Sequence, residues 1–162
     1  DRVRVVVTVG IATGYPFRRL IAQLIPLLSA DGELSRATGR PVEVLWQTAG
    51  TPCDDLPIDA TSALPSAELS AALAEADIVI SHAGTGSATT ILGSGLYPVL
   101  VPRRLSHGEA GDEHQTELAT ELAHRNLCRS VEADAITVDD LLQTLSRRIR
   151  QLPVTPHFEL QR

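Results

Sequence analysis

Residues 76–87 read A-D-I-V-I-S-H-A-G-T-G-S and indicate the fold of this chain. The β-branched apolar run at 78–80 is typical of a buried parallel strand. The small residues after it are typical of a turn that exposes backbone N–H groups and opens a helix. His82 is expected immediately after the strand, and Ser87 where the helix begins. We therefore predict a cradle for an anion, with a phosphorylated ligand as its natural occupant.

Strands and helices are predicted on both sides of this stretch. Runs rich in β-branched or apolar residues indicate strands, and apolar residues at helical spacing between them indicate helices. The predicted strands cover residues 3–9, 42–46, a short stretch around Ile58, 77–81, 98–101 and 128–131. The predicted helices cover residues 17–28, 66–73 with Ser66 as cap, 87 to 93 or 95, 112–123 and 138–152. The last helix would carry Arg147, Arg148 and Arg150 near its C-terminal end, as the helix dipole favours.

The alternation of these elements predicts an α/β fold. Such chains form a doubly wound, Rossmann-like parallel sheet with helices on both faces, linked by right-handed crossovers. We expect a single domain over residues 1–152 and a loosely packed tail over 153–162. Ligands of such sheets bind outside the carboxyl ends of the strands. The loops expected at this edge, around one site, are 10–15, 63–66, 82–87 and 103–112.

The composition excludes several classes of protein. The net charge of −6 argues against a nucleic-acid surface, which normally shows a clustered basic excess. All 14 basic residues are arginine, which excludes a Walker P-loop, a Schiff-base lysine and a lysine general base. Cys53 and Cys128 lack metal-site spacing and are interpreted as ordinary buried thiols. No membrane span or secretory signal is recognisable, so a cytoplasmic protein is expected.

Three ordered motifs resemble a known family. They are H-A-G-T-G-S at 82–87, G-L-Y-P-V-L-V-P-R at 95–103 and D-E-H-Q-T-E-L-A at 112–119. Together they resemble the C-terminal, donor-binding domain of GT-B glycosyltransferase family 28. The resemblance includes the single-domain subunits that pair with a separate acceptor-binding, membrane-associated subunit, and it runs from the loop at Gly10 to about residue 131.

The resemblance implies a UDP-sugar as substrate, UDP-N-acetylglucosamine or UDP-glucose. The residues it implies at the donor diphosphate are His82, Gly84, Thr85, Gly86 and Ser87, with Gly10 in the loop after the first strand. Each has a simpler structural interpretation: the histidine as a satisfied loop residue, and the glycines as requirements of a tight turn.

The same resemblance implies contacts to the sugar and the nucleoside. His114 and Gln115 match positions that contact the sugar, although Asp112 and Gln115 also have the spacing of a capping box. Leu64 and Thr90 match nucleoside-binding positions. Relatives usually have a glutamate where this chain has Thr90, and a single hydroxyl cannot accept two hydrogen bonds from the ribose as a carboxylate does.

The segment 103–112 is rich in charged and histidine side chains. Arg103, Arg104, His107 and Glu109 are interpreted either as a solvated polar loop or as contacts to the donor phosphate or the acceptor half. No metal site and no cofactor are expected. The spacing does not suit metal ligands, and GT-B enzymes stabilise the leaving diphosphate with a helix dipole and side chains.

Two other functions stay open. Gly84 and Gly86 supply the first two glycines of a dinucleotide fingerprint, but Thr89 replaces the third, which leaves an NADP-dependent oxidoreductase as an alternative. Thr90 favours a degenerate, partner-binding subunit. No general base is evident, so the catalytic residue is unknown. We expect the isolated domain to bind donor and to transfer poorly without an acceptor-binding domain or subunit. A membrane-associated subunit of that kind would bring the chain to the inner face of the membrane.

Overall fold

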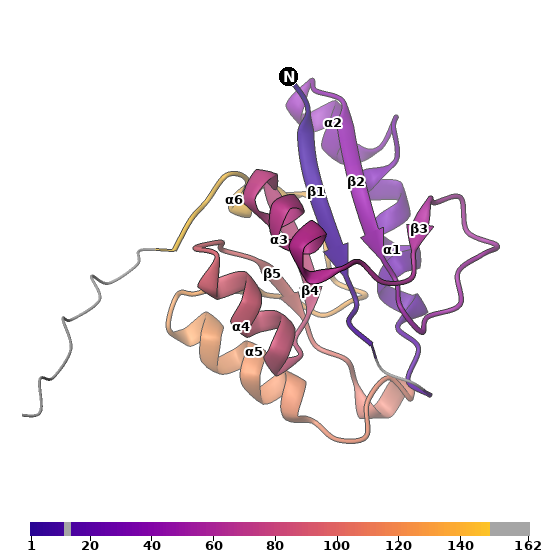
Figure 1. Ribbon diagram of the computed structural model, residues 1–162, viewed down its shortest axis with the longest axis vertical. Helices are drawn as coiled ribbons and strands as arrows, with labels where there is room; N and C mark the ends of the chain where they lie inside the picture. The colour runs from indigo at the N-terminus through magenta and orange to yellow at the C-terminus, as the bar shows by residue number, and fades with distance from the viewer. Residues whose placement is uncertain (12–13, 150–162) are drawn as a thin grey trace, which may run out of the picture.

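The computed structural model describes residues 1–11 and 14–149, which form a parallel sheet of six strands in the order β3-β2-β1-β4-β5-β6 (Figure 1). All of the strand pairs are parallel. The strands are β1 (Val3–Thr8), β2 (Val42–Gln47), β3 (Ala60–Thr61), β4 (Ile78–His82), β5 (Val99–Val101) and β6 (Arg129–Ser130). The order reverses between β1 and β4, which confirms the predicted doubly wound sheet.

Helices cover both faces of this sheet (Figure 1). They are α1 (Arg18–Leu28), α2 (Glu33–Thr38), α3 (Ser66–Glu75), α4 (Thr85–Gly93), the short 3₁₀ helix η1 (Leu105–His107), α5 (His114–His124) and α6 (Val138–Thr144). Alternate strand residues face opposite ways. Val5 and Ile80 pack with α1 and α6, whereas Val6 and Val79 pack with α3 and α4. The apolar side of α5 continues the second layer against Leu100.

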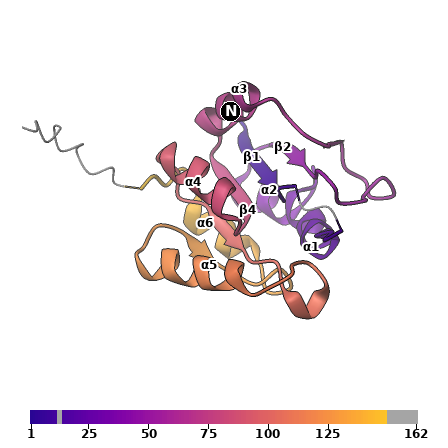
Figure 2. The same cartoon turned by 60° about the horizontal axis from the view of Figure 1, so that its bottom comes forward.

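The strand register brings three loops to one edge. Thr8 of β1 pairs with Ser81 of β4, and His82 of β4 pairs with Val101 of β5. The carboxyl ends of the three central strands therefore lie level. Figure 2 turns this edge forward and shows β4 leading into α4, with α5 alongside. This register brings the loops of the predicted site together at the carboxyl edge of the sheet.

Two elements in the first half of the chain differ from expectation. The third strand is Ala60–Thr61, paired with Trp46 and Gln47, and Ile58 lies just outside it. Ile58 instead packs as a half-buried side chain on the main core. The short helix α2 was not predicted from the sequence, because only Leu34 in it is buried and six residues give too little periodicity.

The closing helix is shorter than predicted. It ends at Thr144 and not near residue 152. Ser146 adopts a positive φ of 56° and donates its backbone N–H to the Asp77 carbonyl at 2.8 Å. Arg148 then forms an antiparallel bridge with Leu96. Backbone partners in the connections before β4 and before β5 thus replace the helical ones.

The arginines expected at the end of that helix lie beyond it. The Arg147 guanidinium stacks 3.8 Å from the centre of the Tyr97 ring. Arg148 donates to the Ala76 carbonyl at 3.1 Å. Arg150 and the predicted tail at 153–162 lie outside the described residues.

Other expectations concern helix caps, thiols and membrane spans. Pro65 occupies the cap position of α3, so Ser66 is the first helical residue and does not cap it. Cys53 and Cys128 are buried free thiols, as expected. Within residues 1–11 and 14–149, no helix combines the length and apolar composition that crossing a bilayer requires.

Candidate functional site

The site is built where β4 passes into α4. His82 is the last residue of the strand and not the first after it, because it still pairs with Val101 of β5. The helix begins at Thr85, with Gly84 at the cap position, so Ser87 lies in its first turn. In the part of the chain that the structure describes, no side chain caps this helix. Its first N–H groups, which have no partner inside a helix, therefore face outward as donors.

The imidazole of His82 is packed between two glycines. A Cβ atom at Gly10 would come within 2.2 Å of His82 Nε2, and one at Gly84 within 2.3 Å of Cε1. Gly10 also has a φ of +65°, which side chains rarely adopt. These two glycines therefore make room for the imidazole of His82. The sequence had suggested only a tight turn or a bound ligand as the reason for glycine at these positions.

Gly86 differs from the other two glycines. A Cβ atom there would have no neighbour within 4 Å. The space beside the first turn of α4 is therefore open, and a ligand can reach the backbone there. Gly86, Thr85 and Ser87 together present the N-terminal end of α4 at the carboxyl edge of the sheet.

Side chains from β4, α4 and α5 converge on this helix start. His82 Nε2 lies 3.0 Å from Ser87 Oγ, and His82 Nδ1 lies 3.3 Å from Gln115 Nε2. The amide oxygen of Gln115 accepts the backbone N–H of Arg103 at 3.1 Å. Three of the residues singled out in the sequence thus form one connected cluster.

The capping-box interpretation of Gln115 is wrong. Its side chain bonds to Arg103 and His82 rather than back to the helix start. The helix α5 begins at His114, whose backbone N–H donates to Asp112 at 3.0 Å. Asp112 therefore precedes the helix that it was expected to open. The His114 side chain is 80% exposed beside Gln115 and points its ring toward solvent.

His82 is neutral at physiological pH. Burial and the nearby positive charge of Arg103 lower the pKa of His82 from 6.5 to about 4. The imidazole therefore acts as a hydrogen-bonding group with one donor and one acceptor nitrogen. At this pH the His82 side chain thus carries a dipole and no full charge.

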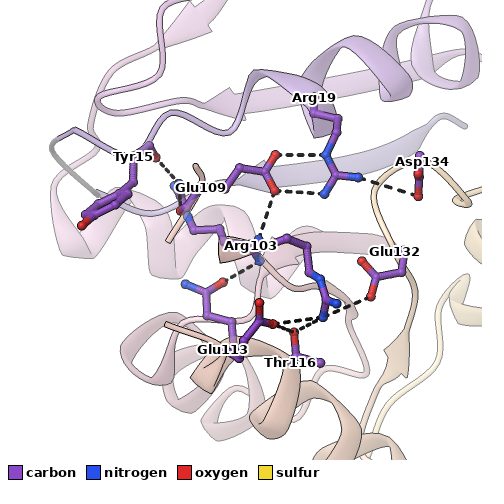
Figure 3. A network of polar contacts seen from close by, with 10 residues as sticks. Tyr15, Arg19, Arg103, Glu109, Glu113, Thr116, Glu132 and Asp134 are labelled. Atoms are coloured by element: carbon purple, nitrogen blue, oxygen red, sulfur yellow. Dashed lines mark hydrogen bonds and ion pairs between the residues drawn. The ribbon is translucent and has the colours of Figure 1, made fainter. Parts of the chain in front are cut away.

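Arg103 is a buried cation that holds the loops of the site together. Only 1% of the residue is exposed. Its guanidinium donates to the carbonyl oxygen of Tyr15 and to that of Glu109 at 3.3 Å (Figure 3). It also donates to the carbonyl oxygen of Val9. It also lies 5.1 Å from the centre of the Phe17 ring. One side chain thus ties the loop after β1 to the loop after β5.

Glu109 is the second buried member of this network. Its carboxylate accepts two hydrogen bonds from Arg19, at 2.9 and 3.0 Å, and one from the Arg104 backbone at 3.1 Å (Figure 3). The interpretation of this segment as a solvated loop is therefore wrong for Arg103 and Glu109. It holds for His107, which is exposed. Arg104 is half-buried and pairs with Glu113 at 3.2 Å.

A pocket of about 160 Å³ adjoins the start of α4, between α3 and α4. It is lined by Thr8, Gln47, Leu69, Leu73, Gly86, Ser87, Thr90 and Ile91. The Thr90 hydroxyl donates to the Gly86 carbonyl at 3.1 Å, which leaves its oxygen free to accept. Leu64, the other predicted nucleoside contact, is half-buried in the loop before α3 and does not line this pocket.

Gln47 was missed by sequence reasoning. It is only 8% exposed, and its Oε1 is buried without a hydrogen-bond partner among the described residues. Buried polar atoms are rarely left unpaired in proteins. Its position at the carboxyl end of β2, beside the predicted site, was the signal that could have found it.

Among residues 1–11 and 14–149, no three His, Cys, Asp or Glu side chains lie close enough together to hold a metal ion. The acidic and histidine side chains of the 103–112 segment either join the arginine network or point outward.

The chain is similar in fold to several solved glycosyltransferases. The first is SnogD from Streptomyces nogalater, with a TM-score of 0.60 and 21% identity over 90% of this chain and 35% of that one. MurG from Acinetobacter baumannii gives a TM-score of 0.59 and 21% identity over 88% of this chain and 40% of that one. The glycotransferase of kitacinnamycin gives a TM-score of 0.57 and 19% identity over 88% of this chain and 33% of that one. The chain therefore spans well under half the length of these proteins.

Sequence comparison places the chain in a family. No curated protein sequence matches it. The family described as glycosyltransferase family 28 C-terminal domain matches residues 4–153, nearly the whole chain. The site described above, at the carboxyl edge of the sheet, lies within the matched residues. The chain therefore belongs to the glycosyltransferase family 28 C-terminal domain family.

Proposed function

We propose that this domain binds the donor of a glycosyltransferase, a UDP-sugar such as UDP-N-acetylglucosamine or UDP-glucose. The diphosphate would lie at the start of α4. The observation that carries the proposal is the uncapped first turn of this helix, with open space beside Gly86 and the side chains of His82 and Ser87 directed to the same place. Helix N-termini of this kind bind phosphate groups.

The same arrangement supports the chemistry of sugar transfer. When UDP leaves the sugar, negative charge develops on the β-phosphate. Backbone N–H groups and side-chain donors already in place stabilise that charge without reorganisation. We infer that Thr85, Gly86 and Ser87 supply these donors from α4. The domain needs no metal for this step, because the helix dipole takes over part of the role of a cation.

The sugar and nucleoside would lie on either side of the diphosphate. The sugar lies toward the start of α5, where His114 is exposed and Gln115 has a second amide N–H besides the one facing His82. The nucleoside lies in the pocket lined by Gln47 and Thr90, with Leu64 at the loop before α3. Gln47 and Thr90 offer the ribose separate acceptor oxygens in place of one carboxylate.

The acceptor would be bound by another domain or subunit. The glycosyltransferases of similar fold are more than twice the length of this chain. We propose that this other domain or subunit binds the acceptor, supplies the general base and brings any membrane association. The isolated domain then binds donor but transfers sugar poorly or not at all.

Calorimetric titration tests this function. UDP and UDP-N-acetylglucosamine should bind, whereas NADPH should not. Ser87→Ala should weaken UDP binding about tenfold, the effect of losing about one charge-assisted hydrogen bond. Ser94→Ala, at the opposite end of the same helix, is the matched control and should leave binding unchanged.

A degenerate, partner-binding subunit is the second candidate. The observation that favours it is Thr90, where a carboxylate would serve the ribose better. Failure of every nucleotide to bind would support that candidate, whereas binding of NADPH alone would support an oxidoreductase. Either result would overturn the donor-binding proposal.

A further inference from the structure

A continuous chain of polar groups leads from the loop after β5 to the first turn of α4. The Arg103 backbone N–H bonds to Gln115 Oε1 at 3.1 Å. Gln115 Nε2 lies 3.3 Å from His82 Nδ1, and His82 Nε2 lies 3.0 Å from Ser87 Oγ. The four residues come from the loop after β5, the helix α5, the strand β4 and the helix α4. The direction of hydrogen bonding along this chain can be worked out from its first member.

The backbone N–H of Arg103 sets the orientation of the Gln115 amide. A backbone N–H can only donate, so the amide atom that it faces must be the oxygen. The N–H itself is held in place, because the buried Arg103 guanidinium is anchored to the carbonyls of Val9 and Glu109. A reversed amide would set its NH₂ group against this N–H. The NH₂ group of Gln115 therefore faces His82.

The orientation of Gln115 then decides which nitrogen of His82 carries the proton. An NH₂ group can only donate, so His82 Nδ1 must accept and carries no hydrogen. A neutral imidazole has one N–H, which is then on Nε2. Protonation of both nitrogens would place Nδ1–H against the Gln115 N–H. Such a contact of two donors is unfavourable.

The last member of the chain is Ser87. Because His82 Nε2–H points at Ser87 Oγ, the serine oxygen is an acceptor in this contact. Its own hydrogen is then free to point into the open space beside Gly86. A serine hydroxyl that accepts one hydrogen bond also becomes a better donor, because linked hydrogen bonds polarise one another.

We propose that Gln115 is a positioning residue that fixes His82 with its proton on Nε2, so that the Ser87 hydroxyl is directed as a donor toward the anion at the start of α4. The final step, donation to an anion, rests on the proposed function. The first step concerns the protein without ligand. The role is additional to any sugar contact, because the second N–H of Gln115 is still available.

The protonation pattern of His82 tests the first step directly. The two ring nitrogens of a histidine have different ¹⁵N chemical shifts according to which one carries the hydrogen. In ¹⁵N-labelled protein without ligand at neutral pH, His82 should show a protonated Nε2 and an unprotonated Nδ1. Its signals are assigned by their loss in His82→Gln. A proton on Nδ1 in the wild-type protein would overturn the proposal without any reference to a variant.

Gln115→Glu provides the second test. One oxygen of the new carboxylate can still accept from the Arg103 N–H, while the other faces His82 Nδ1 as an acceptor. We expect the proton to move to Nδ1, or both nitrogens to be protonated at neutral pH. Thr120→Glu adds the same charge to an exposed position of α5 and should leave the His82 signals unchanged. The backbone amide spectrum of each variant verifies that it is folded.

The outcomes separate this inference from the proposed function. An unchanged His82 pattern in folded Gln115→Glu would overturn the positioning role. If the pattern changes as expected but UDP does not bind the wild-type protein, the positioning of the His82 proton by Gln115 stands and the donor-binding function fails. If UDP binds and the proton moves to Nδ1, Gln115→Glu should weaken UDP binding at least as much as Ser87→Ala, about tenfold, because His82 Nε2 then accepts the Ser87 hydrogen and a negative charge is added.

Discussion

Gly84 lies so close to the imidazole of His82 that a Cβ atom at position 84 would come within 2.3 Å of Cε1. The glycine is therefore required by a packed side chain, whereas Gly86 two residues later faces open space. The two glycines of one motif thus have different physical roles, and substitution separates them.

Gly84→Ala should destabilise the protein, because the added methyl group must displace the buried imidazole or the backbone. Overpacking of this kind costs about 1 to 3 kcal/mol in the free energy of unfolding. Gly86→Ala is the matched control and should not destabilise the free protein, because it meets no neighbour and alanine favours helix. Urea denaturation measures both. Equal stability of the two variants would contradict the packing argument.

The neutral state of His82 makes stability depend on pH. Its pKa is lowered from 6.5 to about 4 in the folded protein, so on acidification the unfolded chain takes up a proton that the folded chain does not. Stability should therefore fall as the pH drops from 6.5 to about 4, by about 3 kcal/mol from this group. His82→Gln should lose this part of the decline. His114→Gln, at an exposed histidine, should retain the wild-type profile in urea denaturation at several pH values.

Arg103→Met should be among the most damaging single substitutions. It would leave the carbonyl oxygens of Val9 and Tyr15 without their buried donor, a loss of about 3 kcal/mol in the free energy of unfolding. Arg104→Met removes a half-exposed arginine next in sequence, and its ion pair with Glu113 is worth about 1 kcal/mol or less. Thermal or urea denaturation of the pair measures the difference. Equal effects would show that the buried position of Arg103 carries no special weight.

Thr90→Glu should strengthen the binding of UDP about tenfold under the proposed function. A carboxylate in the pocket can accept from both ribose hydroxyls, which a threonine cannot. The gain should largely disappear with 2′-deoxy-UDP, which lacks one of them. Thr89→Glu is the control, because it adds the same charge next to the pocket but outside its lining. Equal gains from both variants would indicate a general charge effect.

Local patterns in the sequence predicted the framework of this protein. The β-branched runs at 3–9 and 77–81 indicated buried parallel strands, and the small residues at 82–87 placed the start of a helix at their carboxyl ends. These patterns predict well because backbone preference and side-chain periodicity act over a few residues. The convergence of His82, Ser87 and Gln115 followed from the sheet order, and the structure confirms it.

Only the tertiary structure decided what the side chains contact. The partners of Arg103 include Val9, 94 positions away in the sequence, and spacing along the chain carries no information about such a pair. The closing helix ends at Thr144, and beyond it Ser146 and Arg148 donate to the carbonyls of Asp77 and Ala76, which are distant in the sequence. The sequence left Gln115 with two interpretations, a sugar contact or a capping box, and its bonds to the Arg103 N–H and to His82 rule out the capping box. Local preferences had thus determined the framework of strands and helices. The orientation of the side chains in the site was decided by long-range hydrogen bonds of buried groups, because these depend on how whole elements pack.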